Sequence, residues 1–215
     1  MVATLTPMSA AAQLRAGRLG RRLVQLVIGL IGYGVAVMML VTSGLGAASW
    51  NILAEGVSEA LDISYGWATN LIALLVLVAW IPMRELPGLG TVLNVAIVGF
   101  AADAAGFVLP VPETLLLQAC YLGGGLVAIA FFDALYLGAQ FGSGPRDGIM
   151  TGLTRITDRP IAVVRTGIEI VVAGVGWLLG GTLGLGTVVV ALLMGPLVGF
   201  FLPRVAVQLP ARATT

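Results

Sequence analysis

Apolar residues gather in six long runs along the chain. The runs cover residues 23–42, 65–83, 91–109, 115–138, 163–179 and 185–202. A helix rises about 1.5 Å per residue, so runs of this length can cross about 30 Å of hydrocarbon. Segments rich in Gly and Pro separate the later runs, as in LPGLG at 86–90 and GSGPRDG at 142–148. The pattern predicts an all-α polytopic membrane protein with six transmembrane helices.

Two shorter segments follow the first and fourth runs. They are ILAEGVSEALD at 52–62 and GIMTGLTRITD at 148–158, and their apolar residues recur at helical spacing. Asn51 and Asp147 stand directly before them, each after a break that contains Gly, and both residue types cap helices well. The sequence therefore predicts two short amphipathic helices with Asn51 and Asp147 as their N-caps.

Charge is scarce in this chain. Only 10% of the residues are charged and 59% are hydrophobic, whereas soluble domains carry about a quarter charged residues. The chain has no His and a single Cys, Cys120, which excludes an intrachain disulfide and a zinc site built on His or Cys. We therefore expect a membrane protein without a metal and without another cofactor.

The distribution of charge predicts the topology. With the N-terminus in the cytoplasm, alternating spans leave inside the segments 1–22, 84–90, 139–162 and 203–215. All 11 basic residues are Arg, and each falls in these segments or at a helix end beside them. The outer segments hold acidic residues and no Arg, as the positive-inside rule expects. The prediction is a multi-pass protein with both termini cytoplasmic, the basic tail 1–22 and the tail 203–215. The four Trp residues are expected at the membrane interfaces.

The chain also contains an internal repeat. Residues 43–99 align with residues 139–195 at a constant offset of 96 and without a gap, with about 11 identities in 57 positions. Each copy contains an odd number of spans, so the second half must enter the membrane in the opposite orientation. We predict two inverted three-helix repeats, at 23–109 and 115–202, the layout of many secondary transporters.

Ionisable residues within the membrane are the candidate site residues, because charge there is costly. Asp133 lies in the fourth run, and Arg165 and Glu169 stand one turn apart in the fifth, where they can pair. With Arg146 and Asp147 they form a hypothetical substrate or ion site that faces the cytoplasm. Simpler interpretations stay open: Asp147 as a cap beside an orientation anchor at Arg146, and an Arg165–Glu169 pair that holds helices together.

One region resembles a known family. The stretch GSGPRDGIMTGL at 142–153, followed by VRTGIEIVVAGVGWLLGGTLGLGT at 164–187, resembles the YczE-like membrane proteins of the YczE/YyaS/YitT group. The likeness extends from about residue 44 to 199, and GLGAASWNIL at 44–53 occupies the place of a Gly-rich, Trp-containing motif of that family. The resemblance implies a bacterial inner-membrane protein and supplies no substrate.

These observations favour a small secondary transporter or permease for an unidentified solute, in which Asp133 or Glu169 could couple protons. The alternative is a non-transporting membrane subunit or partner-binding module, such as a substrate-capture subunit driven by a separate ATPase. No nucleophile with a base stands out, so we expect no enzyme, and no basic cluster beyond the membrane anchors points to nucleic acid. The expected partners are the lipid bilayer, the solute, and either a second copy or another membrane protein.

Overall fold

The computed structural model describes residues 10–209, which form helices joined by loops, with no strand among them. Six of these helices are long and apolar enough to cross a bilayer. They are α2 (Leu19–Thr42), α4 (Tyr65–Met83), α5 (Leu89–Gly106), α6 (Leu115–Gly138), α8 (Ile161–Leu178) and α9 (Leu185–Val205). The prediction of an all-helical chain with six spans is confirmed, and no predicted boundary differs from the helix by more than about four residues.

Three shorter helices complete the described chain: α1 (Ala10–Arg15), α3 (Ser49–Leu61) and α7 (Pro145–Thr157). Helices α3 and α7 lie where the sequence predicts them, after the first and fourth spans. Both end on an aspartate in the left-handed conformation, Asp62 with φ 52° and Asp158 with φ 51°. This conformation stops a helix, and Asp tolerates it better than most residues do.

The predicted N-caps of these two helices are wrong by three residues. The N-cap of α3 is Ala48 and that of α7 is Gly144, so Asn51 and Asp147 are the third residues inside their helices. Helix α7 begins early because Pro145 follows its cap, and the fixed φ of proline suits the first helical position.

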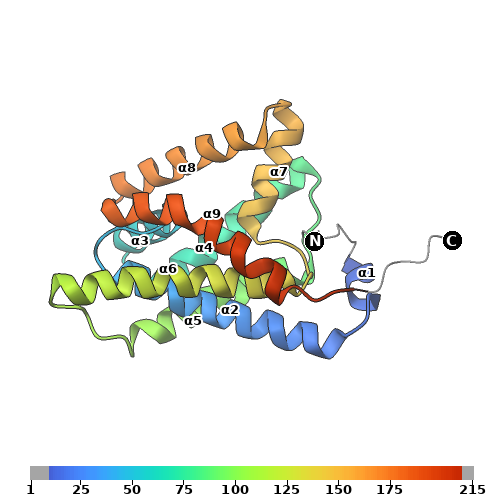
Figure 1. The fold of residues 1–215 in the computed structure, drawn as a ribbon. Coiled ribbons are helices and arrows are strands. Elements are labelled where there is room, and N and C mark those ends of the chain that lie inside the picture. Colours follow the sequence, from blue (N-terminus) through green and yellow to red (C-terminus); the bar gives the residue numbers. More distant parts are fainter. Residues whose placement is uncertain (1–9, 210–215) are drawn as a thin grey trace.

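Helix α2 lies along the lower edge of the molecule in Figure 1, where it packs against both α5 and α6. Its inward face is fully buried at Leu26, Leu30 and Leu40. Close packing depends on small residues: a Cβ at Gly29 would lie 2.7 Å from the backbone nitrogen of Tyr136 on α6. Large apolar side chains cover the outward faces of the helices, as expected of a surface in contact with lipid.

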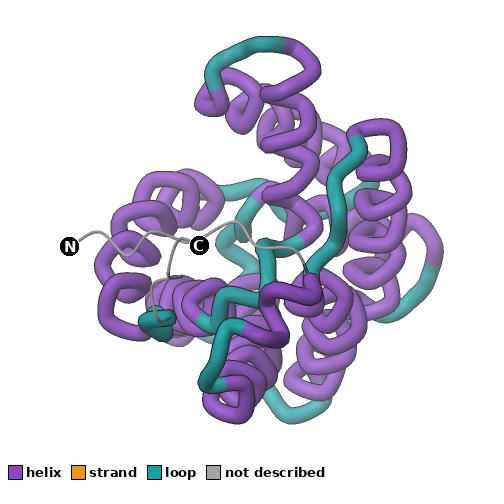
Figure 2. Tube along the Cα trace, turned by 90° about the vertical axis from the view of Figure 1, so that its right-hand side faces the viewer, coloured by secondary structure: helices purple, strands orange, loops and turns teal. Residues whose placement is uncertain are grey.

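The short helices join the two halves of the chain. Helix α3 packs on α8, and α7 packs on α4. The indole of Trp80 lies against Gly148 and donates a hydrogen bond from Nε1 to the carbonyl oxygen of Pro145 at 3.0 Å. In the contact between α3 and α8 the small residue belongs to the membrane span: Gly176 of α8 lies against the backbone of Leu53 of α3. Viewed along the bundle, the helices surround a central region that loops also enter (Figure 2).

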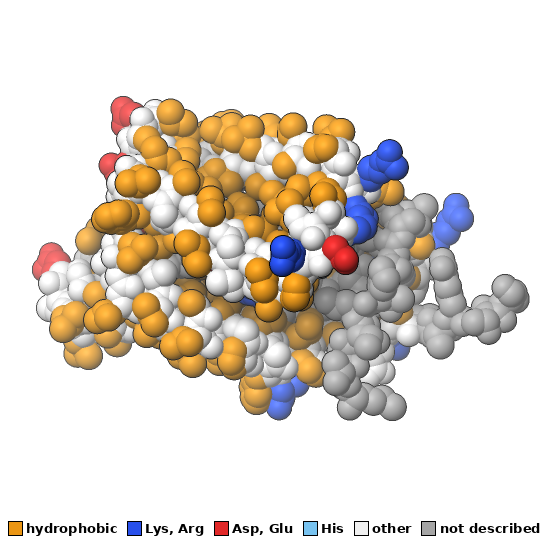
Figure 3. Space-filling model, turned by 90° about the horizontal axis from the view of Figure 1, so that it is seen from above, with side chains coloured by type: hydrophobic (Ala, Val, Ile, Leu, Met, Phe, Trp, Pro, Cys, Tyr) orange, Lys and Arg blue, Asp and Glu red, His pale blue; other side chains and the backbone are white. Residues whose placement is uncertain are grey.

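The described ends of the chain, Ala10 and Leu209, lie at the same end of the bundle, which we name the terminal end; the opposite end is the distal end (Figure 1). Basic side chains lie toward the terminal end, with an acidic side chain among them, whereas the distal end shows acidic side chains and no basic one in this view; apolar side chains lie between the two ends (Figure 3). This separation agrees with the charge pattern of the sequence.

The sequence predicts that Arg22 belongs to the basic tail, but in the structure Arg22 lies inside α2 and is fully buried. Its guanidinium donates hydrogen bonds to the carbonyl oxygens of Ala139, at 2.9 Å, and Gln140, at 2.8 Å. It also lies 4.1 Å from the ring centroid of Phe141. Arg22 therefore ties the start of α2 to the loop after α6.

Candidate functional site

An open cavity of about 710 Å³ lies between α6, α7, α8 and α9, and the start of α3 contributes to its wall. All of the predicted site residues line it: Asp133, Arg146, Asp147, Arg165 and Glu169. The sequence placed them on three separate elements, and the fold brings them to one space. The rim carries exposed residues of α8 and α9, such as Ile170 and Gly195, so the cavity opens between these two helices.

Arg146 stands at the second position of α7, where the helix begins inside the protein. Its guanidinium donates a hydrogen bond from Nη1 to the hydroxyl oxygen of Tyr33 at 3.3 Å. The guanidinium carbon also lies 5.6 Å from the ring centroid of Trp50, within the range of a cation–π contact. Tyr33 is itself held edge-to-face against Tyr136, with ring centroids 6.1 Å apart.

Asp147 follows directly and also faces the cavity. Burial raises the pKa of its carboxyl above the ordinary value, while Arg146 and a backbone hydrogen bond at Gly144 act in the opposite direction. A side chain at the third helical position that reaches back to the N-cap backbone is half of a capping box. Asp147 thus stabilises the start of α7 from inside the helix, although it is not the cap.

The remaining acids and the second arginine come from two spans. Asp133 lies on α6, while Arg165 and Glu169 lie one turn apart on α8. Arg165 and Glu169 do not form an ion pair. Among the described residues, the side chains of Arg155 and Glu85 do form one, with a nitrogen–oxygen distance of 3.1 Å, and they lie outside the cavity. The interpretation in which the α8 pair holds helices together is therefore wrong.

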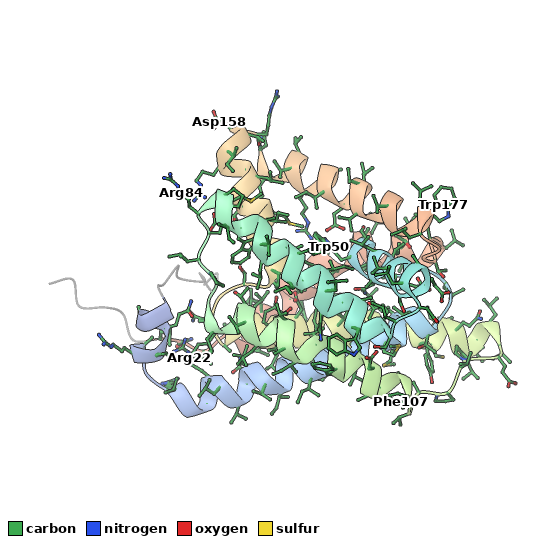
Figure 4. All side chains as sticks on the ribbon, turned by 180° about the vertical axis from the view of Figure 1, so that it is seen from behind. Arg22, Trp50, Arg84, Phe107, Asp158 and Trp177 are labelled. Atoms are coloured by element: carbon green, nitrogen blue, oxygen red, sulfur yellow. The ribbon has the colours of Figure 1, made fainter. Side chains whose placement is uncertain are left out.

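Trp50 is the residue that sequence reasoning missed. It was expected at a membrane interface, yet only 7% of its surface is exposed, and it lies inside the protein between the two ends (Figure 4). Its indole Nε1 has no hydrogen-bond partner. The repeat offset could have singled it out, because Trp50 is the position equivalent to Arg146. Trp80 is likewise buried, whereas Trp67 and Trp177 are exposed as expected.

A second, small cavity of about 30 Å³ lies between α3, α4 and α5. It can hold no more than about two water molecules. Six of its lining residues are Trp50, Ala54, Thr69, Ala73, Asn94 and Val98. At an offset of 96 these become Arg146, Met150, Arg165, Glu169, Val190 and Met194, all of which line the large cavity. Six of the ten residues that line the small cavity thus have equivalents in the wall of the large one.

The difference between the cavities follows from how closely the flanking spans approach. Helices α4 and α5 pack together, and a Cβ at Gly99 would overlap the carbonyl oxygen of Gly66. Asp103 fastens the distal end of this pair: its carboxylate accepts a hydrogen bond from the Ser64 hydroxyl at 2.5 Å and from the Gly66 N–H at 2.6 Å. At Gly195, the equivalent of Gly99, a Cβ would meet nothing within 4 Å.

Within residues 10–209, no three side chains of Asp, Glu, Cys or His gather in a way that could hold a metal ion. The chemistry that the described site offers is therefore that of charges, hydrogen-bond donors and aromatic rings.

Comparison with known proteins gives the family. Residues 20–203 match a family described as "Family of unknown function (DUF6198)". An uncharacterized protein of Haemophilus influenzae is 36% identical over 173 residues, which cover 80% of this chain and 79% of the relative. The uncharacterized membrane protein YczE of Bacillus subtilis is 29% identical over 176 residues, 81% of each chain. The uncharacterized protein YyaS of the same organism is 27% identical over 182 residues, 83% of this chain and 90% of the relative.

No solved structure matches the chain. The predicted resemblance to the YczE and YyaS proteins is confirmed, and the relatives' names give no activity. The chain is a membrane protein with six apolar helices, and it belongs to the DUF6198 family of unknown function.

Proposed function

We propose that this membrane protein is a small secondary transporter that moves a small solute by alternating access, with the solute held in the large cavity. The observation that carries the proposal is the pair of cavities, one large and one small, whose walls share equivalent positions of the two halves. In alternating access a single site opens to one side of the membrane and then to the other. If α8 closed on α9 while α4 separated from α5, the site would become accessible from the opposite side of the membrane.

An inverted relation between the halves supports the proposal. Helices α2 and α4 run in the opposite direction to their counterparts α6 and α8 (Figure 1). The N–H of Gly90 donates a hydrogen bond to the carbonyl oxygen of Phe141 at 2.8 Å. At an offset of 96, the N–H of Gly186 donates to the carbonyl oxygen of Leu45, also at 2.8 Å. Reciprocal contacts of this kind are expected of repeats related by a two-fold axis in the membrane plane.

The arrangement of charge supports an orientation. Arginines gather toward the terminal end, while the distal end shows acidic side chains and no arginine in this view (Figure 3). We therefore propose that the terminal end lies in the cytoplasm, with both chain termini, and that the lipid of the bacterial inner membrane surrounds the bundle. In this orientation the latch of Asp103 closes the outer side of α4 and α5. The open gap between α8 and α9 then belongs to an inward-open state.

A disulfide test can separate this proposal from a static scaffold. Ala162 and Gly195 are equivalent to Gly66 and Gly99, the pair whose backbones approach closely, yet a Cβ at Gly195 would have no neighbour within 4 Å. In a variant without Cys120, cysteines at 162 and 195 should cross-link only when α8 closes on α9. We expect oxidation to trap the closed state and stop solute exchange in liposomes, and reduction to restore it.

The same double-cysteine variant kept under reducing conditions is the matched control and should retain solute exchange. Failure of the 162–195 pair to cross-link under turnover would contradict alternating access. Cross-linking without uptake by the lone protein would favour the alternative, a substrate-capture subunit that needs a separate ATPase. No chemical conversion of the solute is part of the proposal.

A further inference from the structure

We infer that the large cavity binds a zwitterion, a solute that carries an anionic group and an ammonium group on a small apolar body. The inference deepens the proposed function, on which it rests for the location of the solute site. It follows from the signs of the charges in the cavity, their lack of partners, and the chemistry of the rest of the wall.

The cavity holds charges of both signs that do not neutralise each other directly. Neither Arg146 nor Arg165 forms an ion pair with Asp133 or Glu169, and neither of these acids has a hydrogen bond within the described residues. Charged groups within membrane proteins are usually paired with one another or with backbone carbonyls. Here two arginines and three acids, Asp147 included, line one open space, so a ligand that carries both signs can satisfy groups of both kinds.

The positive part of the wall is formed around Arg146. The start of α3 lines the cavity beside it, and the first N–H groups of a helix have no acceptor within the helix. Helix α7 offers fewer such groups, because its first residue, Pro145, has no N–H. The buried indole N–H of Trp50, which also has no partner, adds a further donor. Donors and a cation that meet at one place suit a carboxylate or a phosphate. Asp147, the next residue, also lines the cavity, so this part of the wall places a carboxylate beside the guanidinium.

The negative part of the wall is formed by Asp133 on α6 and Glu169 on α8, on the helices that face α7 across the cavity. Both carboxylates are partly buried and can receive hydrogen bonds from an ammonium group. The remaining wall is mainly apolar, with Ile129, Val190 and Met194 among its residues. The apolar body of a zwitterion therefore finds a suitable surface between the two charged parts.

A ligand of a single charge fits this cavity less well. A simple anion leaves the two acids without partners, and a simple cation leaves Arg146 without one. Leaving a buried charge unpaired is costly, so the unmatched part of the wall acts against these ligands. Two sources supply the zwitterion chemistry: a free amino acid from water, and the headgroup of a zwitterionic phospholipid that enters between α8 and α9.

The decisive experiment compares ligands that share one body and differ in charge. We would measure binding to the purified full-length protein of leucine, 4-methylpentanoate, which lacks the ammonium, and 3-methylbutylamine, which lacks the carboxylate. For the lipid source, dihexanoyl phosphatidylethanolamine would be compared with the anionic dihexanoyl phosphatidylglycerol. We expect one zwitterion to bind about 10- to 100-fold more tightly than its analogues of single charge.

Variants test which group of the ligand each part of the wall binds. Arg146→Gln should weaken leucine to the level of the amine and leave the amine unchanged. Glu169→Gln should weaken leucine and leave 4-methylpentanoate unchanged. Arg21→Gln and Glu113→Gln change exposed residues outside the cavity and are the matched controls. Because each comparison is made between ligands on one variant, a general loss of folding cannot imitate the pattern.

Two results would overturn the inference: an analogue of single charge that binds as tightly as its zwitterion, or no binding of either zwitterion at millimolar concentration. These results leave the proposed transport testable, since a simple ion could still be taken up by liposomes and the 162–195 cross-link could still form. Conversely, a zwitterion that binds without uptake would remove the transport proposal and leave this inference in place.

Discussion

The guanidinium of Arg146 lies over the indole of Trp50, 5.6 Å from the ring centroid, and the two residues are separated by the repeat offset of 96 positions. Each is the second residue of a short helix that begins inside the protein, α3 for Trp50 and α7 for Arg146. The two halves therefore meet at equivalent residues of different chemistry. This contact joins the walls of the large and small cavities, both of which include Trp50 and Arg146.

Replacement of Trp50 tests the importance of this contact. Trp50→Phe keeps an aromatic face under Arg146, whereas Trp50→Leu removes it. A cation–π contact contributes about 0.5–2 kcal/mol, so we expect the free energy of unfolding in detergent to fall in the order wild type, Phe, Leu. Trp177→Leu, at a residue with 60% exposure, is the control and should have little effect. A Leu variant as stable as the wild type would show that the contact contributes nothing.

Asp147→Asn should alter the pH dependence of stability. The pKa of Asp147 is raised in the folded protein, chiefly by burial, so the folded state holds the proton more tightly than the unfolded state does. Its carboxyl thus favours folding at low pH, and that contribution is lost as the pH rises above the ordinary value of about 4 and through the raised one. Asn cannot ionise, so the variant should gain melting temperature over the wild type toward neutral pH.

The control for this measurement is Asp158→Asn, which changes an exposed residue in a left-handed conformation that Asn also accepts. Its difference from the wild type should not change with pH. A difference between wild type and Asp147→Asn that is constant from acid to neutral pH would contradict the raised pKa.

Two equivalent glycines should respond differently to the same methyl group. In Gly99→Ala the methyl overlaps the carbonyl oxygen of Gly66, so we expect a loss of about 1–3 kcal/mol in stability. In Gly195→Ala it meets nothing within 4 Å, and alanine favours the helix by up to about 1 kcal/mol. Gly195→Ala should therefore be at least as stable as the wild type, whereas Gly99→Ala should be less stable. Thermal unfolding in detergent measures both, and an equal loss of stability in the two variants would contradict the different packing of the two pairs of spans.

Asp103→Asn tests the latch at the distal end. Asn retains one oxygen acceptor, so one of the two bonds, to the Ser64 hydroxyl and the Gly66 N–H, should be lost or weakened. Bonds to a charged group contribute about 1.5–3 kcal/mol, enough to shift a two-state equilibrium by tenfold or more. We expect cysteines at 162 and 195 to cross-link faster in this background. An unchanged rate would mean that Asp103 does not hold the distal end closed.

The orientation of the chain can be tested with single cysteines in a Cys120→Ala background. A cysteine at 113 should react with an impermeant thiol reagent added to whole cells, and one at 155 should not. Position 55 is unsuitable for this test, because Glu55 accepts hydrogen bonds from the N–H and the hydroxyl of Thr182, at 2.7 and 2.8 Å, and substitution there would disturb the fold. The reverse labelling pattern would place the terminal end outside the cell.

The sequence alone determined the membrane class, the six spans and the set of charged residues worth testing. These properties are local: a run of apolar residues identifies a span whatever its neighbours are, and a charge inside such a run is costly in any packing. The repeat offset was also readable from the sequence, because Gly and turn residues recur wherever the backbone requires them.

Tertiary structure alone decided how these residues meet. Hydropathy does not specify the rotation or the separation of helices, so the sequence could not show that Arg165 and Glu169 remain unpaired or that Trp50 lies inside beneath Arg146. The cap assignments failed for a related reason, since Asn51 and Asp147 are good caps, but the helices begin earlier, where Pro145 already has a helical φ. The open gap beside Gly195 and the close contact at Gly99 arise from nearly equivalent segments, because the approach of two helices depends on the packing of the whole bundle.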